Sequence, residues 1–240
     1  MRRLAFAAAL LTLTAPALAD RTSEDAMLAK ARRDYLNNPA MEKEALAASN
    51  GRATRRGATL LLQRAGHKPV QRSDNKPACD DEGSRFDAAQ CTRFTLVADL
   101  PARNAYLVAR SGYEGCADLL LIDDRSGRET VFADVPVFSP DGQRLLIQNE
   151  CEADGSASDN HLEIWRRQNG GWVLEWRYTD AEAYAADPTL KRLFRSNVVA
   201  WQGDHIVLTF INTETAQHWT GTLDRQSGRW ILAAGPLHSP

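Results

Sequence analysis

The sequence predicts a mainly β protein: an incomplete or small β-propeller-like array of four-stranded units, preceded by a short helical segment. After residue 57, short runs of Val, Ile, Leu, Phe and Trp alternate with turn residues, which is typical of strands joined by hairpins. Units of about 40 residues with four strands each recur along this part, and this is the size of a propeller blade.

Residues 1–19 have the features of a secretory signal peptide. Arg2 and Arg3 form a positively charged start, a short apolar run follows, and Ala17-Leu18-Ala19 supplies the small residues of a cleavage site. The apolar run is too short to span a membrane. We therefore expect a chain that is cleaved after Ala19 and is periplasmic or secreted. The two arginines leave open whether export uses the general secretory or the twin-arginine route.

Charge and hydropathy argue against two classes of partner. The chain has 29 Lys and Arg against 31 Asp and Glu, a net charge of −2, and loss of Arg2 and Arg3 with the signal peptide lowers it to −4. Binding of nucleic acid needs a basic surface that displaces counterions, so we expect no nucleic acid. No later run is apolar enough to cross a bilayer, so we expect no membrane span in the mature chain.

Residues 20–57 are expected to form an N-terminal helical segment. Apolar residues at helical spacing predict a helix over residues 22–36. Pro39 suits the first position of a second helix, which Asn50-Gly51 ends. Residues 58–240 then form one propeller-like domain.

One hairpin occurs four times in this domain. Each copy consists of a strand, a polar turn with a glycine that can adopt positive φ, and a second strand. The copies are TLLLQRAGHKPV, LLLIDDRSGRETVF, LEIWRRQNGGWVLE and TGTLDRQSGRWILA, with aligned glycines Gly66, Gly127, Gly170 and Gly228.

A second hairpin precedes each of the last three copies, with tight turns at residues 101–104, 140–142 and 202–204. Joining the two kinds of hairpin predicts four-stranded units, and residues before the first unit form half of an earlier one. The units span residues 93–133, 135–178 and 196–234, and the half unit spans 58–72.

The tight turn of the middle unit carries a family resemblance. Phe138-Ser139-Pro140-Asp141-Gly142, followed by Leu145-Leu146-Ile147, resembles the repeat of TolB-type propellers, which are relatives of WD-type repeats. The resemblance implies stacked blades and, as partner, an envelope protein or a cell-wall component. Three and a half units are fewer than an ordinary closed propeller of that family has, so an open or incomplete propeller, or a four-unit ring finished by the N-terminal segment, would fit. A β-sandwich made from the same hairpins is the alternative.

Ser139 and Asp141 stand close together in this stretch, but the pattern favours a turn. A proline followed by Asp and Gly is what a β-turn requires, and the aspartate can bond the local backbone. Nucleophilic catalysis would also need a base oriented toward the serine. We therefore predict a structural turn and assign no catalytic residue.

The long connections of the predicted units fall together at one end. They span residues 111–117, 150–160, 179–195 and 212–216. Loops on a rigid scaffold concentrate binding residues, so this end is the predicted binding face. Its candidates are an aromatic–acid pair between two glycines, an acidic loop with a neighbouring histidine, and a tyrosine in the third connection: Tyr113, Glu114, Glu150, Glu152, Asp154, Asp159, His161 and Tyr184. The acidic loop lacks the EF-hand pattern and the histidines lack zinc-ligand spacing, so neither a metal nor a cofactor is expected.

Four cysteines in an exported chain indicate two disulfides. Cys116 and Cys151 fall in equivalent long connections of neighbouring units, so we expect them to pair. Cys79 and Cys91 would then close the polar loop over residues 73–92.

These features favour an exported, non-catalytic binding or interaction protein that uses the long-loop face for a ligand not yet assigned. One alternative is a hydrolase acting on envelope sugars or peptides, since Glu114, Glu150 and Glu152 offer carboxylates there. The other is a structural module of the envelope. A deep pocket with paired carboxylates would favour the enzyme, and a shallow face would favour binding.

Overall fold

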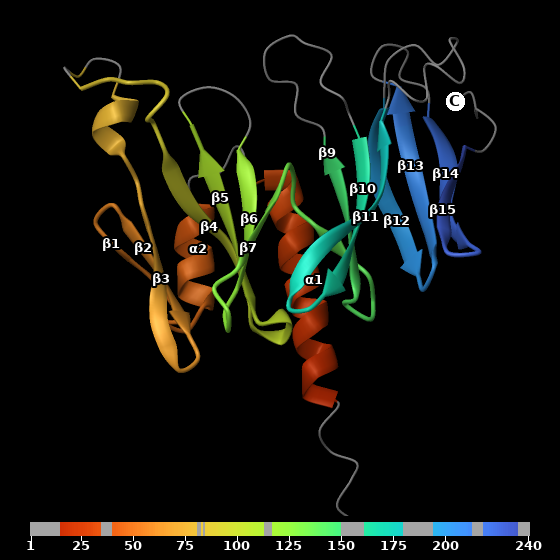
Figure 1. Cartoon of the computed structure of the whole chain (residues 1–240), viewed down its shortest axis with the longest axis horizontal. Helices are drawn as coiled ribbons and strands as arrows, with labels where there is room; N and C mark the ends of the chain where they lie inside the picture. Colours follow the sequence, from red (N-terminus) through yellow and green to blue (C-terminus); the bar gives the residue numbers. More distant parts are fainter. Residues whose placement is uncertain are drawn as a thin grey trace, which may run out of the picture.

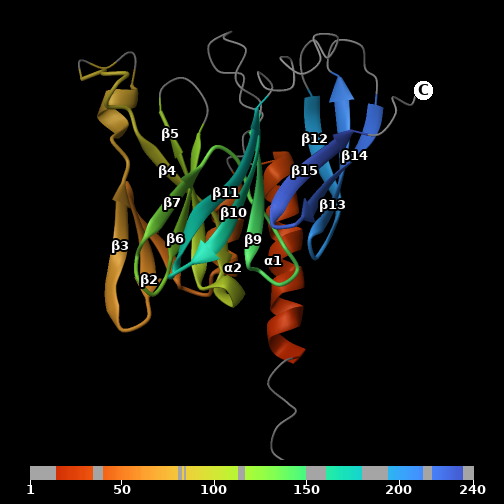
Figure 2. The ribbon, with the colours of Figure 1, turned by 45° about the vertical axis from the view of Figure 1, so that its right-hand side comes forward.

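Four separate antiparallel sheets, standing side by side in chain order, make up most of the chain in the computed structural model (Figure 1). The first and the fourth sheet lie at opposite ends of the row and do not meet, and Figure 2 shows the same separation from a second direction. The predicted fold class is therefore correct: the chain is mainly β, with blade-sized sheets in an open array. The structure describes residues 15–34, 40–80, 83, 85–112, 117–149, 161–179, 194–212 and 218–234.

Sheet 1 has three strands and the other sheets have four, in sequence order within each sheet. Sheet 1 consists of β1 (Ala53–Arg56), β2 (Thr59–Arg64) and β3 (His67–Ser73). Sheet 2 consists of β4 (Arg93–Leu100), β5 (Ala105–Ser111), β6 (Asp118–Asp123) and β7 (Glu129–Phe132). Sheet 3 consists of β8 (Val137–Phe138), β9 (Arg144–Asn149), β10 (His161–Gln168) and β11 (Gly171–Thr179). Sheet 4 consists of β12 (Phe194–Gln202), β13 (His205–Asn212), β14 (His218–Gln226) and β15 (Arg229–Ala234).

The repeated hairpins are where the sequence predicts them. Gly66, Gly127, Gly170 and Gly228 all have positive φ, between 71° and 82°, in the turn before the last strand of their sheets. Positive φ is strained for most side chains, so glycine suits each of these turns. Sheets 2 and 4 also carry a bulge at the same place in their first strand, three residue pairs before the tight turn. Sheets 2 and 4 thus match in this detail, whereas sheet 3, whose first strand is only Val137–Phe138, shares the glycine turn but not the bulge.

Sheet 1 is larger than the predicted half unit. β1 lies within the segment that we expected to be helical, and it pairs with β2 through a turn at Gly57, which has a φ of 61°. Its sequence, ATRR, lacks the apolar residues of a typical strand, so the sequence pattern does not predict a strand here. Ala53 alone of these four residues is buried in the core. The β structure therefore starts at residue 53 instead of 58.

The first helix also differs from the prediction. α1 (Ala15–Asp34) begins before Thr22 and runs through the predicted cleavage site, because an alanine-rich stretch favours helix. Among the side chains of α1 that the structure describes, the first with a contact to the sheets is Arg21, which donates to the carbonyl of Asp141 at 3.4 Å. Cleavage after Ala19 would therefore leave the described contacts of α1 in place. The second helix, α2 (Met41–Ala48), lies where it was expected.

Each pair of neighbouring sheets buries its own apolar cluster. The cluster between sheets 2 and 3 includes Leu28 and Ala31 of α1, and the cluster between sheets 1 and 2 includes Ala45 of α2. A third cluster, which contains Trp201 and Trp230, joins sheets 3 and 4. The two helices thus complete the packing of the first three sheets.

β4 is an edge strand of sheet 2, and side chains cover its outer edge, where it has no neighbouring strand. The N–H of Leu96 donates to Oε1 of Glu42 at 3.0 Å, and the N–H of Phe94 donates to Oδ1 of Asp74 at 2.9 Å. Arg55 donates to the carbonyl of Phe94 and also bridges the two carboxylates, at 2.6 Å from Glu42 and 3.2 Å from Asp74. Unpaired backbone groups at a strand edge cost free energy when they are buried, and an exposed edge can pair with another chain. Glu42, Arg55 and Asp74 satisfy these groups of β4, so this triad stabilises the array.

Replacing Glu42 with alanine should destabilise the protein strongly. The change leaves the N–H of Leu96 without its acceptor and removes one of the two carboxylates that Arg55 bridges, at a cost of about 2–4 kcal/mol. The matched control is Glu44→Ala on the same first turn of α2, where the exposed ion pair with Lys30 contributes below about 1 kcal/mol. Urea unfolding measures both. Equal losses in the two variants would contradict the role of Glu42 at the β4 edge.

Candidate functional site

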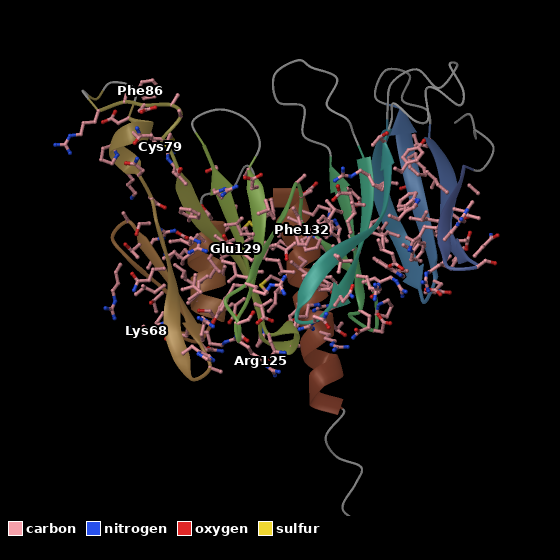
Figure 3. The ribbon with its side chains drawn as sticks, in the orientation of Figure 1. Lys68, Cys79, Phe86, Arg125, Glu129 and Phe132 are labelled. Atoms are coloured by element: carbon pink, nitrogen blue, oxygen red, sulfur yellow. A yellow bond between two sulfur atoms is a disulfide. The ribbon has the colours of Figure 1, made fainter. Side chains whose placement is uncertain are left out.

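The array has two ends, which differ in the length of the connections that lie there. The long-loop end is defined by the strand ends that flank the long connections: Ser111, Asp118, Asn149, His161, Thr179, Phe194, Asn212 and His218. The tight-turn end is the opposite one, where the turns before the last strand of each sheet gather, together with the tight turns between the first two strands of sheets 2, 3 and 4 (Figure 1). Figure 3 places Lys68 and Arg125 at the tight-turn end and Phe132 between sheets 2 and 3.

The residues predicted to form the binding face lie almost entirely outside the described residues. His161 opens β10 at the long-loop end, and only its backbone is described. The scaffold does bring the flanking strand ends to one end, as the sequence predicts, but how the candidates face one another stays a prediction. The candidates outside the described residues are Tyr113, Glu114, Glu150, Glu152, Asp154, Asp159 and Tyr184.

The disulfide between Cys79 and Cys91 is present, with Cα atoms 4.6 Å apart. Both cysteines are buried, and Cys79 ends the short 3₁₀ helix η2 (Lys76–Cys79). Figure 3 shows Cys79 and the exposed Phe86 above sheet 1, at the long-loop end. The bond therefore holds the polar connection between sheets 1 and 2 beside the predicted binding face.

The predicted Cys116–Cys151 pairing involves two residues outside the described part of the chain. Peptide mapping under non-reducing conditions is expected to find a peptide that joins them, since both cysteines lie in equivalent connections of adjacent sheets. A peptide joining Cys116 to Cys79 or Cys91 would contradict both this pairing and the Cys79–Cys91 bond of the structure.

The Ser139–Gly142 turn uses its polar atoms structurally, as predicted. The hydroxyl of Ser139 donates to Oδ1 of Asp141 at 2.6 Å and accepts the N–H of Arg144 at 2.9 Å. Asp141 also accepts the N–H of Gln143 at 2.9 Å. Burial raises the pKa of Asp141, but these hydrogen bonds outweigh it and lower the pKa below its ordinary value. The serine and the aspartate are therefore parts of a turn rather than a catalytic pair.

A small pocket opens at the tight-turn end between sheets 2 and 3. Its volume is about 20 Å³, a little more than one water molecule needs, so only a small group could enter it. Three basic side chains, one acidic side chain and two aromatic rings line it: Arg103, Arg128, Arg167, Asp123, Phe138 and Trp172.

Arg103 forms the inner wall of this pocket, and its charge is already compensated. It lies in the 3₁₀ turn η3 (Pro101–Arg103), its side chain is 6% exposed, and it binds both Glu24 and Asp25 of α1. Its guanidinium also lies over the ring of Phe138, 4.4 Å from the ring centre. Burial raises the pKa of Glu24, although the N–H of Ala102 and Arg103 oppose the shift. This network attaches α1 to sheets 2 and 3.

Arg128 and Arg167 line the outer part of the pocket and are far less engaged. Arg128 makes one long hydrogen bond, 3.5 Å to the carbonyl of Asn169, and packs so close to Gly171 that an added Cβ there would lie 3.0 Å from its guanidinium carbon. Arg167 has its nearest carboxylate, Asp123, at 4.0 Å. Within the described residues its side chain donates no hydrogen bond. The pocket thus contains two cationic groups with few acceptors.

The sequence contained a signal for these arginines that we did not use. Basic residues lie next to each aligned glycine, as in the stretches QRAG, RSGR, RRQNGG and RQSGR. Because the glycine turns share one end of the array, their arginines gather there. The sequence of a turn does not show which arginine pairs with a carboxylate of a neighbouring sheet. The pocket could therefore not be predicted from these stretches.

A second ionic cluster joins sheets 1 and 2 and involves a carboxylate pair. Arg52 lies 3.1 Å from Asp99 and 2.5 Å from Asp124, and its guanidinium faces the ring of Tyr106 at 5.1 Å. Tyr106 is buried and donates its hydroxyl to the carbonyl of Gln63 at 2.7 Å. Burial raises the pKa of Asp99 to about 6, despite the opposing charge of Arg52. Since Arg52 spans both carboxylates, this cluster holds the sheets together.

Comparison with known proteins assigns no family to this chain, since no family model and no curated protein match it. Within the residues that the structure describes, His, Cys, Asp and Glu side chains form no group of three or more that could hold a metal ion. The described helices include none that is both long and apolar enough to cross a membrane. The site is therefore interpreted from its own residues.

Asp134 should make the protein more stable as pH falls from 7 to 5. It lies in the link between sheets 2 and 3, where burial raises its pKa to about 6, against the effects of the Val135 N–H and Arg32. The folded state therefore binds a proton below pH 6 that the unfolded state binds only near pH 4, which adds about 1 kcal/mol at pH 5 relative to pH 7.

Urea unfolding of Asp134→Asn at both pH values checks this effect. The variant should gain less stability on acidification than the original protein. Asp141→Asn serves as the control, because a lowered pKa leaves Asp141 largely ionised in both the folded and the unfolded state between pH 7 and 5, so its loss should not change the response to pH in that range. An unchanged response to pH in Asp134→Asn would contradict the assignment.

Proposed function

We propose that this chain is an exported, non-catalytic binding protein of the cell envelope that captures its partner at the long-loop end. The single observation that carries the proposal is geometric. The strands that flank all four long connections end at the same end of one rigid array, whereas the opposite end consists of tight turns that contact neighbouring sheets. Long connections on such a scaffold are suited to recognition.

Export is supported by the N-terminal sequence and by the Cys79–Cys91 bond. Structural disulfides persist in oxidising compartments such as the periplasm. The packed part of α1 begins after the predicted cleavage site, so a mature chain that starts at Asp20 keeps these contacts. We therefore place the mature protein in the periplasm or outside the cell.

The Phe138–Gly142 stretch and the four-stranded sheets support a relation to TolB-type propeller repeats, and hence an envelope protein or a cell-wall component as partner. This relation is a likeness of scaffold, which does not by itself fix function. A hydrolase remains the second candidate because of the carboxylates predicted at the long-loop end. The best-defined Ser–Asp pair and the Asp99–Asp124 pair are bound in structural networks, which favours binding over catalysis.

Affinity capture from solubilised envelope extract tests the proposal, with the mature chain immobilised. Replacing Tyr113 and Glu114 together with alanine should reduce capture of the main partner at least about tenfold, as expected for loss of a central contact pair. Arg229→Gln at the tight-turn end is the control and should leave capture unchanged. Equal capture by all three proteins would contradict a long-loop site. Hydrolysis of envelope sugars or peptides, abolished by Glu150→Gln, would instead favour the enzyme.

A further inference from the structure

We propose that the pocket between sheets 2 and 3 binds an oxyanion, the carboxylate or phosphate group of a small ligand, between Arg128 and Arg167. This pocket lies at the tight-turn end, opposite the face assigned to the partner, so the site does not depend on the function proposed above.

Arg167 provides the first argument. Its side chain is 34% exposed, which leaves its guanidinium partly removed from water at the pocket wall. Among the described residues it donates no side-chain hydrogen bond, and its closest carboxylate oxygen is 4.0 Å away, at the limit of an ion pair. The other half-buried arginines near sheet junctions, such as Arg52 and Arg144, each bridge two carboxylates. A planar guanidinium of this kind is suited to a bidentate contact with an oxyanion.

Arg128 provides the second argument, because its position is fixed without a charged partner. Its guanidinium carbon would lie 3.0 Å from a Cβ at Gly171, so the glycine leaves room for this close approach. Its one hydrogen bond is the 3.5 Å contact to the carbonyl of Asn169. The side chain is thereby held against the turn of sheet 3 while its charge stays available to the pocket.

The other walls make the pocket selective for a small anion. Arg103 adds little net charge, since Glu24 and Asp25 compensate it. Phe138 and Trp172 meet edge to face at 5.8 Å and supply an apolar wall that strengthens nearby charge interactions.

Asp123 is the one carboxylate of the lining, and it opposes an anion. Its Oδ1 is occupied by the N–H groups of Arg125 and Ser126, at 3.1 and 2.7 Å, and by the hydroxyl of Ser126 at 2.8 Å. Two arginines against this one acid leave a net positive charge at the mouth, so an oxyanion is the ligand class that fits.

The repeat itself offers a matched control for this site. Arg128 follows Gly127 directly, and Arg229 follows Gly228 directly at the equivalent position of sheet 4. Sheet 4 ends the array, so Arg229 has no following sheet against which to form a pocket. Arg128 and Arg229 thus have the same charge, the same position in the turn and similar exposure, but only Arg128 lines a pocket.

Titration calorimetry of the mature protein with inorganic phosphate and, separately, with acetate tests the proposal. At least one of the two anions should bind, and Arg167→Gln should weaken its binding at least about tenfold, the value of one charge-assisted hydrogen bond. Arg128→Gln should have a similar effect, and Arg229→Gln should change the affinity less than about twofold. Added sodium chloride should weaken binding to the original protein, since the contact is ionic. Thermal unfolding establishes that each variant is folded.

Arg167→Lys is a second variant that tests the proposal even if Arg167→Gln does not fold. It retains the charge but not the planar fork, so its affinity should lie between those of the original protein and Arg167→Gln. The proposal is overturned if neither anion binds at millimolar concentration, or if Arg229→Gln weakens binding as much as Arg167→Gln. Binding to vesicles of anionic lipid without binding of free phosphate or acetate would also overturn it, because the attraction would then belong to the whole surface.

Discussion

The edge of β4, which no strand covers, is the constraint on which the rest of this structure depends. β4 is the first strand of sheet 2 and has no strand on its outer side, so the backbone groups of that edge must find other partners. Glu42, Arg55 and Asp74 provide them, from α2, β1 and the end of β3. The three side chains act in place of a strand, and in doing so they tie α2 and sheet 1 to sheet 2. Without this contact α2 would lose its polar attachment to β4, whereas α1 is held separately through Glu24, Asp25 and Arg103.

Ionic contacts at the tight-turn end repeat this role at every junction. Arg64 of sheet 1 donates to the carbonyl of Arg125 in sheet 2 at 2.6 Å, and Arg128 of sheet 2 reaches the turn of sheet 3. Between sheets 3 and 4, Arg144 and Arg225 both bridge Glu175 and Asp204. A closed ring holds each blade from two sides, whereas an open row depends on the strength of each single junction. The large share of arginines at this end follows from that requirement.

The tight-turn end supplies cohesion between the sheets, and most of its described charged groups are paired. Arg167 stands out among them, because its closest carboxylate oxygen lies 4.0 Å away. The Cys79–Cys91 bond lies at the opposite, long-loop end, where it stabilises the polar connection between sheets 1 and 2.

Local patterns in the sequence by itself determined a large part of this protein. The four glycine turns, the three four-stranded units, the structural use of Ser139 and Asp141, and the Cys79–Cys91 pairing all depend on residues close together in the chain. Backbone conformation and short loop closure set such features, so they can be predicted without knowledge of the fold.

Only the tertiary structure decided how these units are joined. The polar strand β1 is a strand because it lies beside β2. Glu42 meets Leu96, and Glu24 meets Arg103, across 54 and 79 residues of sequence. The pocket arginines likewise become a site only when two sheets bring their turns together. Packing and charge compensation in the folded chain determine which residues pair over such distances in sequence. A local sequence pattern carries no information about these partners.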